Sequence, residues 1–141
     1  MNEIAAAGAR LQQVSGLAAI LDAACGAFED MLSVLWDRID PGEPLFIAML
    51  TAATCAADGR DAVLFAPSLP PHRRPAAPQA GSGQGSVDVV AGAVADLCML
   101  LAARLAEAAP SAADHGDRAA CHAAARYASQ IHEALAGASP L

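Results

Sequence analysis

The four cysteines of this 141-residue chain are the side chains whose type and placement point most directly to a chemical site. Each falls on a different predicted helix, and no two of them form a Cys-x-x-Cys pair. Thiolates are soft ligands that suit Zn²⁺ and Cu(I), and a structural zinc site is completed by a full set of such ligands. The candidates for a metal site are Cys25, Cys55, Cys98 and Cys121.

The levels of the cysteines along their helices decide whether they could meet. If the helices alternate in direction, all four cysteines lie within one or two turns of the same level, since each helical residue rises ~1.5 Å. They could then ligate one Zn²⁺ or Cu(I) ion in the core. The alternative is that they are packing residues, because free cysteine behaves as a small buried hydrophobe. We favour packing and expect no cofactor.

Composition excludes several other kinds of chemistry. All eight basic residues are arginine, so the chain has neither a Schiff-base lysine nor a phosphate-binding Gly-Lys-Ser/Thr loop. No Ser-His-Asp arrangement or pair of Glu-x-x-His motifs can be recognised, which favours a non-enzymatic protein. The net charge of −7 argues against nucleic acid or an anionic membrane as a partner, because both require a basic surface.

The segments that carry the cysteines are all predicted to be helices. In the first segment, apolar residues recur at alternating intervals of three and four, which is typical of one long helix over about 3–39. This stripe comprises Ile4, Ala7, Leu11, Val14, Ala18, Leu21, Cys25, Phe28, Leu32, Leu35 and Ile39. A second apolar stripe runs beside it, so the helix should contact more than one neighbour. Gly16 weakens this pattern, and a break there is the alternative.

Three further helices are predicted, over about 44–58, 87–109 and 112–136. Asp58-Gly59 is a plausible helix stop, because glycine readily takes the left-handed conformation that ends helices, and an extension to 65 is the alternative. Residues 66–86 are rich in proline and glycine and are predicted to be a linker. The chain, 1–141, is therefore expected to be a single all-α domain. Its expected architecture is an antiparallel four-helix bundle with a long first helix and a Pro/Gly-rich linker between the second and third helices.

The first and third predicted helices carry more apolar surface than one core requires. This excess predicts a homodimer, and it favours a non-enzymatic interaction or accessory module that binds a protein partner. The alternative is a bundle that binds a small apolar ligand between its first three helices. The predicted lining of that pocket is Phe28, Leu32, Phe46, Met49, Leu97 and Leu101. A cysteine-ligated Zn²⁺ or Cu(I) bundle is the second alternative.

The sequence shows no secretory signal, because no basic residue precedes an apolar run near Met1. The longest charge-free apolar stretch, Pro44–Ala57, is shorter than the ~20 residues that a membrane-spanning helix requires. We therefore expect a cytoplasmic protein without a membrane partner.

Overall fold

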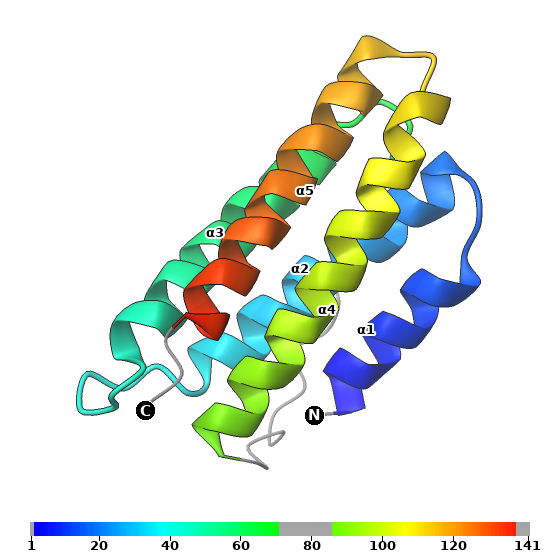
Figure 1. Cartoon of the computed structure of the whole chain (residues 1–141). Helices are drawn as coiled ribbons and strands as arrows, with labels where there is room; N and C mark the ends of the chain where they lie inside the picture. Colours follow the sequence, from blue (N-terminus) through cyan, green and yellow to red (C-terminus); the bar gives the residue numbers. More distant parts are fainter. Residues whose placement is uncertain (1, 71–85, 138–141) are drawn as a thin grey trace.

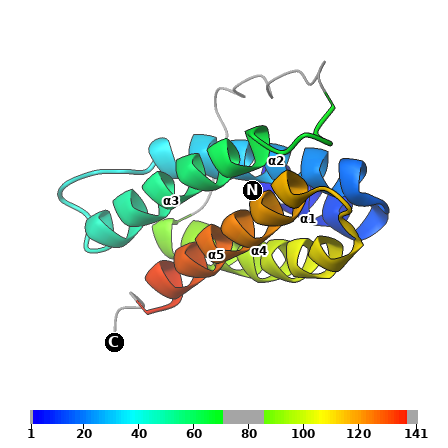
Figure 2. The same cartoon turned by 90° about the horizontal axis from the view of Figure 1, so that it is seen from above.

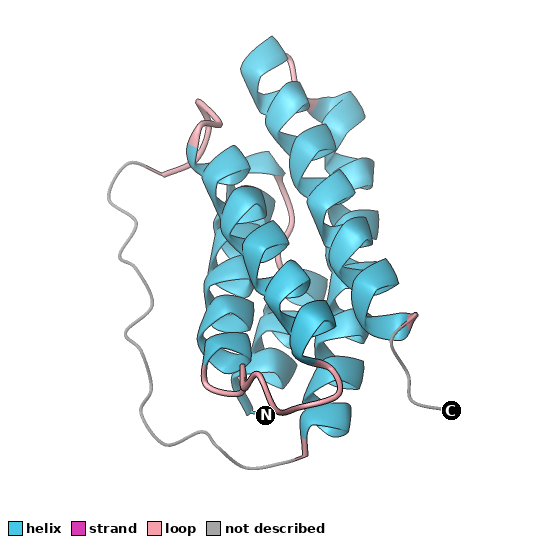
Figure 3. Cartoon of the chain, turned by 90° about the vertical axis from the view of Figure 1, so that its left-hand side faces the viewer, coloured by secondary structure: helices cyan, strands magenta, loops and turns pink. Residues whose placement is uncertain are grey.

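The described part of the chain, residues 2–70 and 86–137 of a computed structural model, is helical and contains no strand (Figures 1 and 3). Its elements are α1 (Asn2–Gln13), α2 (Leu17–Trp36), α3 (Phe46–Leu64), α4 (Val87–Ala108), the 3₁₀-helix η1 (Ala109–Ser111) and α5 (His115–Ala136). The predicted all-α class is confirmed. The predicted count of four helices is wrong, because the described residues form five α-helices. Most of the predicted linker over 66–86 lies outside the described residues.

Gly16 divides the predicted first helix into α1 and α2. Its backbone has φ 91° and ψ 148°, a conformation that residues other than glycine rarely adopt. Helical hydrogen bonding in α1 runs as far as Val14, whose N–H donates to the carbonyl of Arg10, and resumes where Ile20 N–H donates to Gly16. The chain reverses between them, so α1 runs antiparallel to α2 (Figure 1). The single helix predicted over 3–39 is therefore corrected to two helices, of which the second ends at Trp36.

Helix α3 continues through the predicted stop at Asp58-Gly59 and ends at Leu64. The extended alternative is thus confirmed for this helix. Gly59 is a buried residue in the middle of α3, where the ring of Phe28 from α2 lies directly against it. Glycine serves here to let two helices approach closely, and it does not end the helix.

The later helices begin at side chains that cap their N-termini. The hydroxyl of Ser86 accepts a hydrogen bond from Val89 N–H at the start of α4, the usual role of serine at a helix N-cap. Asp114 caps α5 by accepting from Gly116 N–H at 2.6 Å and Asp117 N–H at 3.4 Å. The cap places the first turn of α5 three residues later than the predicted start at 112.

The directions of the helices differ from simple alternation. Helix α4 begins at the end of the molecule where α2 connects to α3, because Val87 lines the same hollow as residues of the 37–43 segment. It therefore runs parallel to α3, and α5 runs antiparallel to both (Figure 1). Helix α5 packs along α3 and α4, while α1 packs against α2 and α4. Figure 2 shows α2 and α3 on one side of the molecule and α4 and α5 on the other.

The core is continuous across all five helices and is rich in small side chains. Helix α3 buries Ala52, Ala53 and Ala56, and α5 buries Ala120, Ala124 and Ala128. Alanine faces allow helix axes to approach more closely than faces built from leucine. The larger side chains are concentrated on α2 and α4, which together contribute Phe28, Met31, Leu35, Leu101 and Leu105 to the fully buried set.

Candidate functional site

Cys98 lies in the centre of the core, where its Sγ atom is 3.3 Å from Sδ of Met31 on α2. Both residues are fully buried. Burial raises the pKa of the Cys98 thiol far above its ordinary value, and the nearby Cys55 raises it further. The neutral thiol is therefore the form present at neutral pH, and it packs as a small apolar group.

The other cysteines occupy three different environments. Cys55 is half-buried, and its thiol donates to Oε1 of Gln130 at 3.7 Å. Desolvation, and then the charge of Asp58, raise the pKa of Cys55. Cys121 is buried near the start of α5, where desolvation and then the charge of Asp117 raise its pKa. Cys25 is fully buried on α2.

The predicted site of four cysteines is not formed. Among the described residues, no group of three or more His, Cys, Asp or Glu side chains is arranged to hold a metal ion. The shared level assumed for the four cysteines required each helix to reverse direction. Because α4 instead runs parallel to α3, Cys121 is displaced toward the end of the molecule where α3 finishes. Of the other three cysteines, Cys55 is the one whose charge affects the pKa of Cys98.

The six residues predicted to line a ligand pocket are mostly part of the packed core. Phe28, Met49, Leu97 and Leu101 are buried, and Leu32 and Phe46 are half-buried. The ring of Phe28 fills the space above Gly59. Leu97 also lines a surface hollow, which lies between α4 and α1.

This first hollow, the α1–α4 hollow, has a volume of about 300 Å³. Its lining residues are Ile4, Ala5, Gly8, Ala93, Asp96, Leu97 and Leu100. Every lining side chain except that of Asp96 is apolar or absent. The hollow exists because Gly8 and Ala5 leave space where larger residues of α1 would contact α4.

A second hollow, the α4–α5 hollow, has a volume of about 480 Å³ and a more polar lining. It is lined by Leu45, Asp88, Ala91, Gly92, Ala95, Asp96, His132, Leu135 and Ala136. The Nδ1 atom of His132 lies 3.1 Å from the carbonyl oxygen of Ala95. A carbonyl can only accept, so Nδ1 carries the proton of this bond, and Nε2 is the acceptor of the neutral ring.

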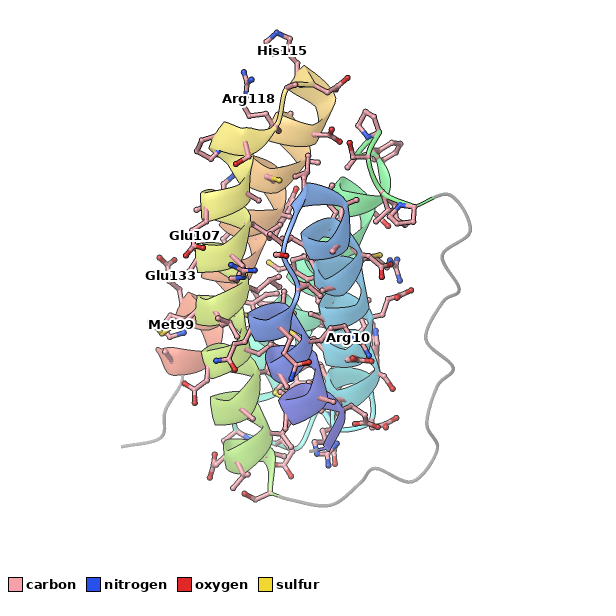
Figure 4. All side chains as sticks on the ribbon, turned by 90° about the vertical axis from the view of Figure 1, so that its right-hand side faces the viewer. Arg10, Met99, Glu107, His115, Arg118 and Glu133 are labelled. Atoms are coloured by element: carbon pink, nitrogen blue, oxygen red, sulfur yellow. The ribbon has the colours of Figure 1, made fainter. Side chains whose placement is uncertain are left out.

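Between the two hollows, α4 presents an exposed ridge to solvent. Val89 is 54% exposed and Met99 is 59% exposed. Figure 4 shows Met99 projecting outward from α4. We define the α4 ridge as Val89, Gly92, Asp96, Met99 and Ala103, which are all exposed.

Two polar anchors have no signal in the sequence, because their partners are far apart along the chain. Arg104 of α4 donates from Nε to the carbonyl of Leu11 at 2.9 Å and from Nη2 to the carbonyl of Val14. The carbonyl of Leu11 lies in the C-terminal turn of α1 and that of Val14 directly follows it, and carbonyls at a helix C-terminus lack intrahelical partners. The guanidinium therefore fastens the end of α1 to α4, while its Nη1 atom pairs with Glu107 at 3.2 Å.

The second anchor is Asp117, the one buried charged residue of the described chain. Its Oδ1 atom accepts from the backbone N–H of Ser68 at 2.8 Å, and its Oδ2 atom accepts from the Ser68 hydroxyl at 2.5 Å. Pro67 packs against the neighbouring Gly116, where a β-carbon would be 3.0 Å from the proline ring. The segment after α3 is thus held against the first turn of α5.

One described stretch, Val87–Ser111, is long and apolar enough to cross a membrane by length and composition, with a mean hydropathy of 1.9 over an 18-residue window. It comprises α4 and η1 and therefore includes the principal buried face of α4. Core helices of soluble proteins pass the same test, so a single stretch of this kind is a weak indication.

In comparisons with known proteins, no family model, curated protein or solved structure matches the chain.

Proposed function

We propose that this protein is a non-enzymatic helical interaction module that forms a homodimer through the α4 ridge. The observation that supports the proposal is the exposed α4 ridge, which lies between two hollows on one surface. Helices pack by placing the side-chain ridges of one into the grooves of another. A ridge flanked by grooves is therefore the shape of a helix-binding surface.

A second copy is the partner that this surface suits. In a two-fold interface the same patch serves both partners, so each patch must carry a protrusion and a matching depression. Met99 supplies the protrusion, and the hollows beside α4 supply the depressions. The first predicted helix has more apolar surface than one core requires. Other helices of the same chain bury part of this surface, because α1 folds back on α2 and α4. The surface that remains for a partner is consequently narrower than the sequence alone suggests.

The test is the mass of the protein in solution as a function of concentration, by light scattering after size exclusion. We expect a dimer whose dissociation constant rises about tenfold or more in Met99→Glu, which places a charge in the apolar interface. The matched control is Ile47→Glu, since Ile47 is 69% exposed on α3, away from the α4 ridge. A monomer at all concentrations, or equal weakening by both substitutions, contradicts the proposal.

Salt provides a second readout of the same interface. Each copy carries a net charge of −7, so two copies repel one another at long range. Added salt screens this repulsion and leaves the apolar contact intact. Dimerisation through the α4 ridge should therefore strengthen with ionic strength, whereas a dimer held by ion pairs would weaken.

Binding of a small apolar ligand is the second candidate function, favoured by the apolar lining of the α1–α4 hollow. Its volume of about 300 Å³ is at the lower limit of typical ligand sites. Native mass spectrometry of freshly purified protein would detect such a ligand as an added mass. Ala93→Leu, which fills the hollow from α4, should remove that mass, and its persistence would place the ligand elsewhere.

A further inference from the structure

Helix α1 is held to the rest of the fold by an apolar face and by a polar anchor at its C-terminal end. Ile4, Ala7 and Leu11 are buried between α2 and α4. Arg104 binds the carbonyl groups at the C-terminal end of the helix. All of these contacts depend on residues of α1 and its groove, and none of them requires that α1 belong to the same chain.

The connection between α1 and α2 is short and conformationally simple. Helical hydrogen bonds reach Val14 from one side and begin at Gly16 from the other. Gly16 is exposed, and a β-carbon placed on it would meet no atom within 4 Å. The reversal of the chain therefore takes place at the positive φ of Gly16, and no atom crowds the position of a β-carbon there.

The apolar spacing of the sequence continues across this reversal as if it were absent. Leu11, Val14, Ala18 and Leu21 follow one another at intervals of three, four and three residues. In the folded chain, Val14 is only half-buried and Ala18 is exposed. In a straight helix through Gly16 the same residues would lie on one uninterrupted stripe. The sequence thus suits two states, a hairpin of α1 and α2 and a single continuous helix.

We infer that α1 is exchanged between two copies of the chain by straightening of the helix at Gly16. In the exchanged dimer, α1 of one copy occupies the groove between α2 and α4 of the other and makes the same apolar contacts with Leu97 and Leu100. The carbonyl groups of Leu11 and Val14, which bind Arg104 in the hairpin, gain helical N–H donors in the straight helix. The apolar contacts of α1 are thus reused between copies, which is the basis of domain swapping. This inference rests on the proposed self-association, and it names the element that passes between the copies.

The sharpest test is Gly16→Ala. Alanine is strained at a φ of 91° and is the best helix former, so the substitution disfavours the hairpin and favours the straight helix in both copies. We expect the dissociation constant of the dimer to fall by about a hundredfold or more, as measured by analytical ultracentrifugation. Ser15→Gly should act in the opposite direction and weaken the dimer about fivefold or more, because it loosens the straight helix at the hinge.

Ala9→Gly is the matched control for these variants. Ala9 is an exposed residue of α1 that is helical in both states and lines neither hollow. The substitution should leave the dissociation constant unchanged. An effect as large as that of Ser15→Gly would mean that helix propensity alone explains the results, which would overturn the exchange.

Disulfide trapping identifies the exchanged element directly. A Gly8→Cys chain is mixed with a Leu100→Cys chain, equilibrated at high concentration and oxidised. A covalent heterodimer, recognised by its mass, supports exchange if its yield rises when both chains also carry Gly16→Ala, because a link across the surface contact of two unexchanged copies would not depend on Gly16. A yield that Gly16→Ala does not raise overturns the exchange. A wild-type dimer that responds to Met99→Glu but yields no heterodimer and is unaffected by Gly16→Ala overturns the exchange and leaves the proposed function standing. If neither wild type nor Gly16→Ala dimerises, both proposals fail.

Discussion

Phe28 and Gly59 lie so close across the interface of α2 and α3 that a β-carbon on Gly59 would be 2.5 Å from two carbons of the Phe28 ring. Both residues are buried, and the ring occupies the space that the missing side chain leaves. A glycine in the middle of a helix weakens it by about 1 kcal/mol relative to alanine. The contact with the largest fully buried side chain of the core offsets that loss.

Gly59→Ala should therefore destabilise the protein although it improves helix propensity. The added methyl group forces the Phe28 ring or the two helices apart, and overpacking of this kind costs about 1–3 kcal/mol. Gly92→Ala is the control, because a β-carbon on this exposed residue of α4 meets no atom within 4 Å. It should be neutral or stabilise the helix by up to about 1 kcal/mol. Urea unfolding followed by helical circular dichroism measures both.

A compensating substitution tests whether the two residues act as a pair. Phe28→Leu removes the ring atoms that a β-carbon on Gly59 would strike. In the Phe28→Leu background, Gly59→Ala should lose most of its penalty, with a coupling energy of about 1 kcal/mol or more. Additive effects of the two substitutions would show that the predicted clash is relieved in another way.

The contact of Ser68 with Asp117 should contribute measurably to stability. Ser68→Ala removes the hydroxyl that donates to a buried carboxylate, and hydrogen bonds to charged groups contribute about 1.5–3 kcal/mol. Asp117→Ala removes both acceptors and should cost more than Ser68→Ala in the free energy of unfolding. A loss below about 0.5 kcal/mol for both variants, the range of ordinary surface substitutions, would contradict this role.

Arg104 should control the local stability of α1 more than that of the whole fold. Arg104→Ala leaves the carbonyls of Leu11 and Val14 without their donors, so amide hydrogen exchange should accelerate across residues 2–13. Exchange in the buried part of α5 should be unchanged. Glu107→Gln is the control, since it weakens only the exposed ion pair, whose contribution is small. Equal acceleration in α1 and α5 would indicate global destabilisation instead.

Alkaline pH should unfold the protein through its buried thiols. The pKa values of Cys55, Cys98 and Cys121 are raised above the ordinary value of 9.0 in the fold. Above pH 9 the unfolded chain therefore releases protons that the folded chain retains, and the stability present at lower pH is lost as pH rises. Each retained proton contributes a slope of about 1.4 kcal/mol per pH unit.

The absence of lysine makes this titration easy to assign, because few other groups change charge in that range. Cys98→Ala should reduce the slope of unfolding free energy against pH between 9 and 11 by the contribution of about one proton. The measurement is urea unfolding at several pH values under reducing conditions. An unchanged slope in Cys98→Ala would mean that the other cysteines account for the effect.

The sequence predicted which segments form helices more accurately than it predicted where each helix begins and ends or in which direction it runs. The three- and four-residue spacing of apolar side chains identified every helix-forming segment, because burial on one face imposes that period wherever the helix lies. Asp114 was missed, although an aspartate followed by polar residues of a first turn is a typical start signal.

Gly16 and Gly59 show why the same residue type led to opposite errors. The local pattern suggested that a helix continues through the first and stops at the second, and the structure reverses both. Gly16 takes a positive φ at the reversal that lets α1 cover α2 and α4. Gly59 stays helical because the Phe28 ring requires the space above it. Neither reason is contained in the residues next to the glycine.

The sequence by itself determined the all-α class, the helix-forming segments and the burial of most of the apolar residues, since these follow from local periodicity and from the transfer of apolar surface out of water. The tertiary structure alone decided that α1 folds back, that α4 runs parallel to α3, and that Cys121 therefore lies apart from a common set of four cysteines. It also placed Arg104 against the carbonyl of Leu11, and it placed Ser68 against the carboxylate of Asp117. These contacts join residues distant in the sequence, and their formation depends on how whole helix faces fit, which no local pattern encodes.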